Sequence, residues 1–593
     1  MDIVGFDFGT TNSLVSIIRG GRPINFFDDQ GLPIPSTVCY EGSHAIVGRD
    51  AKERMGTAGL GVYGNIVRSP KILVGQESVF VDGVERSVVD VVADVIKEVK
   101  RMALASRGRE LKGLEAAVVT IPVNFEGYRR AAIRDAFRAA DVRVVQFIHE
   151  PFAALYGFMR SADDYANFIR QYDRQIILVF DWGGGTLDLT LCRLESGALL
   201  QIANDGTDDV GGDMFDESLR REVLRAVRHE RGLAETVSHH PDAMVRLLHQ
   251  CERAKIDLST RDSVEIYVDH FFRGVADDAL NCRVARTTLE AVTHELVSAG
   301  IARIHSLLDA ANVSPAQVAM CLATGGMANV PVIKARLHEL FGAQRVHAHA
   351  RGGASMAEGA AWVAHDRASL QLAKSVELAL ARNSYLPLVK AGTRMPSEGE
   401  VAGDKFHLYC VDPRDGSAKF QIVSPRRPGT RVLPNDQRAP LTTMTLSVDT
   451  NARPFRERLE LQVRIDDNLI LHADAVALLS KGASDRVEVH NLEFGIEMPE
   501  QGSPVSESDE SVGSIERTSP VEKGTVTVRA NVADSVDSSL VPGELQYELE
   551  PNYFDTRRKP PQIQVEERLY YAPCAKCGRL SNDPACRCGS AYR

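Results

Sequence analysis

Two stretches of the sequence place an aspartate, glycines and threonines between apolar segments. They read GFDFGTTNS, beginning at Gly5, and VFDWGGGTLDLT, beginning at Val179. Glycine lets the main chain bring its N–H groups close to phosphate oxygens, and threonine adds a hydroxyl donor. Asp7 and Asp181, each at the end of an apolar run, can bind magnesium through water. Together the two stretches predict a grip on a triphosphate and its magnesium ion.

The repetition of this pattern matters more than either copy. One Gly-Thr turn between strands has a simpler interpretation as a structural turn. Two copies with the same layout indicate a duplicated, two-lobed domain with ATP in the cleft between the lobes. A phosphate loop ending in Gly-Lys-Ser or Gly-Lys-Thr is not apparent in the sequence.

Composition indicates a soluble protein of two to four domains. The chain has 593 residues, of which 44% are hydrophobic and 25% charged, and no apolar run is long enough for a membrane span. A net charge of −11 argues against general nucleic-acid binding. The acidic second residue argues against a signal peptide, and scattered cysteines favour a reducing cytoplasm.

The chain divides by the period of its apolar residues. Alternating strand-like and helix-like stretches predict an α/β domain, and later alternating segments separated by turn signals predict antiparallel β structure. A following stretch rich in Ser, Glu, Pro and Gly predicts disorder. The expected parts are 1–372, a two-lobed nucleotide-binding domain; 373–384, a linker; 385–498, a β-sandwich; 499–523, a disordered linker; 524–570, an unassigned β-rich segment; and 571–593, a cysteine-rich tail.

Seven motifs occur in an order that resembles the seventy-kilodalton heat-shock chaperones of the DnaK type. They are GFDFGTTNS, VVTIPVNF, IHEPFAALYG, VFDWGGGTLDLT, DVGGDMFD, CERAKIDLS and ATGGMANVP. The resemblance covers roughly residues 1–365, and more loosely 374–495. It implies an actin-like ATPase domain followed by a substrate-binding sandwich, and it separates the chain from actin and the sugar kinases, which share the fold.

The same resemblance implies roles for individual residues. The phosphate loops match Gly9, Thr10, Thr11 and Asn12, and Gly183, Gly184, Gly185 and Thr186. Asp7, Asp181 and Asp188 match the carboxylates that order magnesium and its waters, with Thr186 near the attacking water. Lys71 matches the catalytic lysine and Glu150 a magnesium-water ligand. Taken alone, Lys71 could be a surface lysine, and Glu150 could only complement a helix dipole.

Glu252, Lys255 and Ser259 share one helix face by their spacing of three and four. In isolation they predict a solvent-exposed Glu–Lys pair. Their position in CERAKIDLS implies contact with adenosine, and Gly325 and Gly326 match a second turn on the adenosine side. Pro122 resembles a proline that couples nucleotide state to the second domain.

The second half departs from the family pattern. Residues 500–593 show no long amphipathic helix, so we expect a divergent member without the helical lid. The tail has the spacing of a zinc-ribbon-like module, and its four thiolates favour Zn²⁺, with a redox-active cluster as the alternative. The ligands would be Cys574, Cys577, Cys586 and Cys588.

The sequence therefore favours a slow ATPase of the chaperone type, using ATP and Mg²⁺, that binds unfolded or client polypeptides. A J-domain co-chaperone and a nucleotide-exchange factor are implied as partners by resemblance. A nucleotide-gated scaffold for one dedicated partner is the alternative, and a small-molecule kinase on the same fold is a third.

Overall fold

The computed structural model describes residues 2–57, 64–105, 111–240, 242–348, 352–380, 384–480, 483–499 and 526–527. Apart from residues 499 and 526–527, the expected disordered linker, the unassigned segment and the Cys574–Cys588 cluster lie outside these residues. All the elements below belong to one unit, Met1–Val528.

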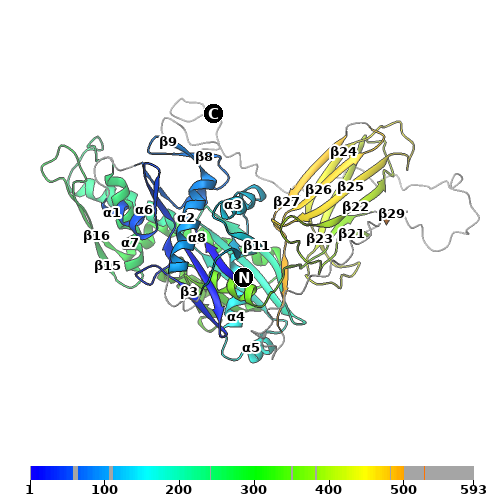
Figure 1. The fold of residues 1–593 in the computed structure, drawn as a ribbon, viewed down its shortest axis with the longest axis horizontal. Coiled ribbons are helices and arrows are strands. Elements are labelled where there is room, and N and C mark those ends of the chain that lie inside the picture. The colour runs from blue at the N-terminus through cyan, green and yellow to red at the C-terminus, as the bar shows by residue number, and fades with distance from the viewer. Residues whose placement is uncertain are drawn as a thin grey trace, which may run out of the picture. The chain divides into compact units, whose positions relative to one another are not determined.

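The sheet of the first lobe combines a three-stranded antiparallel meander, which comes first in the chain, with two further strands parallel to its first strand. Its two edge strands, β3 and β11, are labelled in Figure 1. β1 pairs in parallel with β10 and antiparallel with β2. In spatial order the strands are β11 (Arg143–His149), β10 (Ala116–Ile121), β1 (Ile3–Phe8), β2 (Asn12–Arg19) and β3 (Arg22–Phe26), and β4 (Ile34–Pro35) pairs with β2.

The second lobe repeats this arrangement. β12 pairs in parallel with β17 and antiparallel with β13, which pairs with β14. Every residue of β12 is buried, as expected of a strand covered on both faces. The order is β18 (Val346–Ala348), β17 (Val318–Thr324), β12 (Ile176–Trp182), β13 (Leu187–Glu195), β14 (Ala198–Thr207), β28 (Phe494–Glu497) and β19 (Gln371–Leu372). The predicted α/β class and internal duplication are therefore present.

Two central helices join the lobes. α10 packs on the first sheet, α4 packs on the second, and the two helices cross. The crossing is close, because a Cβ on Gly359 would lie 1.9 Å from the carbonyl oxygen of Ala153. The two helices are α4 (Glu150–Arg160) and α10 (Ser355–His365).

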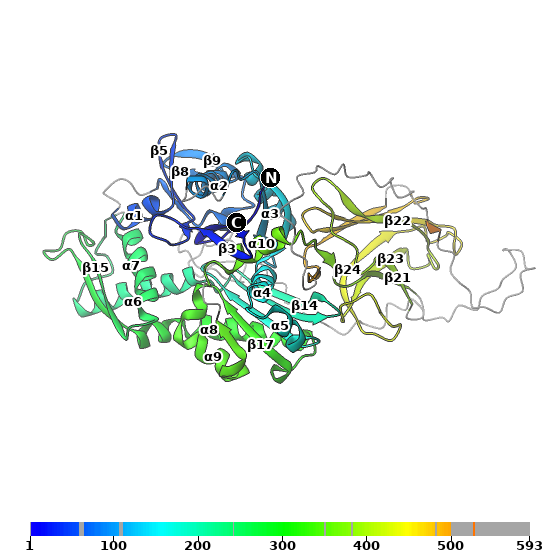
Figure 2. The same cartoon turned by 60° about the horizontal axis from the view of Figure 1, so that its bottom comes forward.

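In the second lobe α8 packs on the sheet, and α6 and α7 form a separate core with β15 and β16. α1 of the first lobe lies against α7 of the second (Figure 2). The first lobe carries α1 (Arg49–Thr57), α2 (Val88–Ala105) and α3 (Gly127–Ala139), with β5 (Thr37–Glu41), β6 (His44–Val47), β7 (Ile66–Arg68), β8 (Ser78–Val81) and β9 (Val84–Ser87). The second carries α5 (Tyr165–Tyr172), α6 (Gly212–Glu230), α7 (Ala243–Leu258), α8 (Arg286–Ala310) and α9 (Pro331–Phe341), with β15 (Ser263–Val268) and β16 (Leu280–Ala285). Among the described helices, none is long and apolar enough to cross a membrane.

The β domain consists of two sheets whose strands pair antiparallel, except that β29 pairs in parallel with β22. Its alternating pattern buries every second side chain, as in β25, where Leu461, Val463 and Ile465 are inside. One sheet has the order β21 (Tyr385–Val389), β20 (Val376–Ala379), β23 (Ser417–Pro425) and β24 (Arg438–Ser447). The other has β27 (Ser484–Val489), β26 (Leu471–Ala477), β25 (Arg458–Asp466), β22 (Val401–Tyr409) and β29 (Val526–Thr527). The 373–384 stretch, expected as a linker, thus contains the paired strand β20.

Candidate functional site

The two predicted phosphate loops face each other across the lobes. Gly9–Asn12 joins β1 to β2, and Gly183–Thr186 joins β12 to β13. A Cβ on Gly185 would lie 2.5 Å from Thr10 Cγ2, and one on Gly184 would lie 2.0 Å from Thr11 Oγ1. Glycine at these two positions therefore allows the opposing threonines to approach.

Buried acidic residues converge beside the loops. Asp7 lies on β1, Asp181 and Asp188 are cross-strand partners on β12 and β13, and Glu150 is the first residue of α4. Lys71 lies in the short 3-10 helix Pro70–Leu73, and its Nζ is 2.6 Å from Glu150 Oε1. The sequence-predicted catalytic and magnesium residues are thus brought into one cluster.

Each aspartate of the cluster receives a hydrogen bond that fixes its carboxylate. Thr120 Oγ1 donates to Asp7 Oδ1 at 2.8 Å, and Thr324 Oγ1 lies 3.1 Å from Asp181 Oδ1. The backbone N–H of Val123, directly after Pro122, donates to Asp188 Oδ1 at 2.8 Å.

Burial and the crowding of negative charge raise the pKa values of these aspartates. Burial, followed by the charge of Glu150, raises the pKa of Asp7 to about 6 and the pKa of Asp188 to about 7. The same causes raise the pKa of Asp181 well above its ordinary value. Lys71 lowers the pKa of Asp7 and of Asp188, so its charge offsets part of the repulsion.

This donor set fits Mg·ATP. Four carboxylates share one lysine, so a divalent cation would offset the remaining charge, and oxygen donors are the ligands that Mg²⁺ prefers. Thr11 Oγ1 is buried without a hydrogen-bond partner among the described residues, which leaves a donor for a phosphate oxygen.

The predicted adenosine-side residues lie at the rim between the lobes. Lys255 on α7 donates to the carbonyl oxygen of Gly212 at 2.9 Å and pairs with Asp216 on α6. Ser259 directly follows α7, and its hydroxyl lies 3.3 Å from the Lys255 carbonyl oxygen. Glu252 forms its ion pair with Lys52 on α1, at 2.6 Å, and not with Lys255 one turn along its own helix.

Gly325 and Gly326 follow β17. Gly325 has a φ of 77°, and a Cβ there would lie 2.3 Å from the carbonyl oxygen of Trp182, so the turn requires glycine. Gly326 faces open space, where a ring could approach the main chain.

Sequence reasoning missed the ion pairs that join the lobes over the site. Arg68 on β7 pairs with Asp213 at 2.6 Å and with Asp216 at 3.3 Å, both on α6, and Lys52 pairs with Glu252 on α7. The sequence held one signal for Arg68: it lies three residues before Lys71, so a segment that brings Lys71 to the site also brings Arg68 near it.

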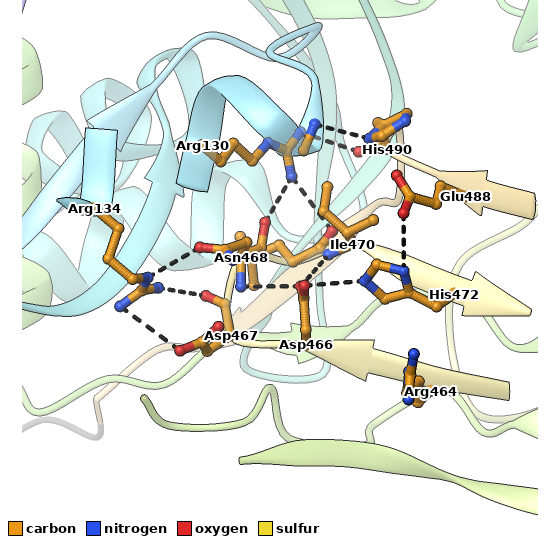
Figure 3. A network of polar contacts seen from close by, with 12 residues as sticks. Arg130, Arg134, Arg464, Asp466, Asp467, Asn468, Ile470, His472, Glu488 and His490 are labelled. Atoms are coloured by element: carbon orange, nitrogen blue, oxygen red, sulfur yellow. Dashed lines mark hydrogen bonds and ion pairs between the residues drawn. The ribbon is translucent and has the colours of Figure 1, made fainter. Parts of the chain in front are cut away.

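The β domain contacts the first lobe beside the site (Figure 3). Arg130 on α3 is fully buried and donates to the carbonyl oxygens of Asn468 and His490, both at 3.1 Å. Arg134, one turn later, donates to Asp467 and Asn468. Burial lowers the pKa of Arg130 to about 10.

The receiving loop of the β domain is fixed internally. Asp466 accepts the backbone N–H groups of Asn468 and Ile470, both at 3.0 Å, and pairs with His472. That hydrogen bond raises the pKa of His472 (Figure 3). The loop is therefore pre-formed for the two arginines.

The fold consists of a two-lobed α/β domain with a β domain attached. The sequence model of the Hsp70 protein family matches residues 3–369. The chain belongs to the Hsp70 family.

Three curated relatives illustrate the extent of the match. Chaperone protein DnaK of Mycoplasma mycoides is 30% identical over 342 residues, 57% of this chain and 55% of the relative. Chaperone protein DnaK of Thermotoga neapolitana is 29% identical over 348 residues, with 57% and 55% covered. Heat shock protein hsp-6 of Caenorhabditis elegans is 28% identical over 366 residues, with 57% and 53% covered. The chain spans about half the length of these relatives.

Proposed function

We propose that the chain binds Mg·ATP between its lobes, hydrolyses it slowly, and couples nucleotide state to the binding of client polypeptide by the β domain. The observation that carries this proposal is the convergence of the facing Gly-Thr loops with the buried cluster around Lys71. Membership of the Hsp70 family, whose curated relatives are named as chaperones, supports it.

Phosphoryl transfer needs mainly positioning and charge neutralisation. Asp7, Asp181 and Asp188 would hold Mg²⁺ through water, and the ion would neutralise phosphate charge. Lys71, held by Glu150, adds a second positive charge at the transferring group. The Thr186 hydroxyl, which bonds to Asp188, would lie near the attacking water.

An exposed apolar group at one end of the β domain supports polypeptide binding. It consists of Tyr409, Phe455, Leu478 and Leu479. Hydrogen bonds tie these turns together, since the N–H of Phe455 donates to the Cys410 carbonyl oxygen at 2.9 Å. Exposed apolar side chains gathered on a rigid end suit an extended apolar segment.

Partners and the tail extend the proposal. We propose a J-domain co-chaperone and a nucleotide-exchange factor as partners, and a cytoplasmic location, which the free thiols of the described cysteines support. We also propose one zinc ion on Cys574, Cys577, Cys586 and Cys588, supported by their spacing alone. Metal analysis of the full chain should give about one zinc, lost in Cys574→Ser.

ATP turnover of the full chain tests the function. We expect slow hydrolysis that rises with an unfolded peptide and a J-domain protein. Turnover that rises only with a sugar acceptor and yields a phosphorylated product would indicate a kinase. Turnover that responds to neither addition, with one partner retained, would indicate the scaffold instead.

A further inference from the structure

The chain returns from the β domain to the ATPase domain as β28. This strand pairs antiparallel with β14 on one side, where Leu199 faces Ile496, and with β19 on the other, where Leu372 faces Phe494. Within this sheet, the strand that leads into the β domain is therefore joined to β14 through the strand that leads out of it.

Hydrogen bonds anchor both ends of β28. The carbonyl oxygen of Glu493 accepts the N–H of Ala373 at 2.8 Å, and the N–H of Met498 donates to the Gly197 carbonyl oxygen at 2.8 Å. On the β-domain side only residues 490–493 separate β28 from β27, a reach of at most about 14 Å. A movement of the β domain would therefore act on β28 directly.

Phe494 is a buried residue at the start of this strand. Its side chain is 1% exposed, and its ring centroid lies 5.5 Å from that of His149. Its backbone N–H donates to Gln201 Oε1 at 2.8 Å, and Gln201 Nε2 lies 3.3 Å from His149 Nδ1. Gln201 and His149 are buried as well.

These contacts fix the orientation of the Gln201 amide and, through it, of the His149 ring. A backbone N–H can only donate, so Phe494 forces the oxygen of the Gln201 amide toward itself and the NH₂ group toward the imidazole. His149 Nδ1 then lies within hydrogen-bond distance of that NH₂ group, so the contact fixes how the imidazole is oriented.

His149 is the cap residue of α4, directly before Glu150. Glu150 holds Lys71 at 2.6 Å. We propose that Phe494 is a positioning residue for ATP hydrolysis, which acts through His149 to hold Glu150 against Lys71. This proposal rests on the proposed function. A displacement of the strand that leaves the β domain would then change the position of Glu150 relative to Lys71.

The test compares Phe494→Ala and Phe494→Leu with the control Ile496→Ala, all in the full chain. Ile496 shares the strand face and is equally buried, but its cross-strand partner is Leu199. Three quantities are measured: the single-turnover hydrolysis rate, the ATP affinity, and hydrogen exchange of peptides covering residues 146–156 without nucleotide.

We expect Phe494→Ala to slow hydrolysis about tenfold, since small displacements of catalytic groups are costly. ATP affinity should stay within about threefold, because the lost interaction acts on the chemical step. Exchange around residue 149 should accelerate. Phe494→Leu should keep most of the hydrolysis rate, and Ile496→Ala should leave the hydrolysis rate, the ATP affinity and the hydrogen exchange near their wild-type values.

An unchanged rate in Phe494→Ala, or an equal loss in Ile496→Ala, would overturn the proposal, because the strand would then only close the sheet. Failure of the proposed function is a different result: wild-type chain that binds no Mg·ATP. The exchange measurement needs no nucleotide, so unchanged exchange in Phe494→Ala would refute the contact to His149 on its own.

Discussion

Replacing Lys71 by methionine removes the positive charge of the acidic cluster while keeping a long side chain. Lys71 is 4% exposed, and its partner Glu150 is also buried. Breaking a buried ion pair on one side costs about 3–5 kcal/mol of folding free energy. Loss of a preorganised charge at the transferring phosphate lowers turnover about 100- to 1000-fold. We therefore expect nearly complete loss of hydrolysis with ATP still bound.

The stability loss of Lys71→Met should depend on pH with a defined sign. Lys71 lowers the pKa of Asp7 and of Asp188, so its removal raises both further above their unfolded values. A carboxyl group with a raised folded pKa destabilises the fold as pH rises toward that pKa. The deficit against wild type should thus be larger at pH 8 than at pH 5.

Two assays on the same preparation measure these effects: single-turnover hydrolysis of labelled ATP, and urea unfolding at pH 5 and pH 8. The matched control is Lys52→Met, which breaks the other 2.6 Å Lys–Glu pair of the site region, at the rim. Normal turnover in Lys71→Met would remove Lys71 from the catalytic site and refute the reasoning.

Three further predictions concern other parts of the structure. Lys52→Met should speed nucleotide release several-fold in a fluorescent-nucleotide assay, because it breaks the ion pair to Glu252 that joins the lobes. Gly185→Val should abolish ATP binding in calorimetry without unfolding the chain, since its Cβ would lie 2.5 Å from Thr10; unchanged affinity would contradict the facing loops. Burial lowers the pKa of His490, whose Nδ1 accepts a backbone N–H of α3, so stability should fall as pH drops through about 6.5; His490→Asn, which keeps an acceptor, should flatten that loss in denaturant titrations.

Much of the nucleotide-binding fold could be predicted because its signals are local. The apolar run Ile176–Phe180 specifies a buried strand, and the Gly-Thr turns after Asp7 and Asp181 occur at the ends of strands with the same topology. The residues that flank Lys71 predicted it as the catalytic lysine. The structure places it against Glu150, in a short 3-10 helix that begins at Pro70.

Pairing between residues far apart in the chain could not be predicted from the sequence, because no local pattern encodes it. Phe494–Glu497 has the alternation of a final β-domain strand, and only tertiary structure shows that its partner is β14. The Lys52–Glu252 pair joins residues 200 positions apart. Glu252 also has a lysine one helix turn away, so spacing favoured a pair that the fold does not form.

Calorimetric titration of ATP into the full chain, with magnesium and with chelator, tests the central claim most directly. The account predicts saturable binding of about one nucleotide per chain, weakened at least about tenfold by chelation, because the ion would offset the negative charge of the carboxylates and of the phosphates. The absence of magnesium-dependent binding, or equal binding by Gly185→Val, would contradict it.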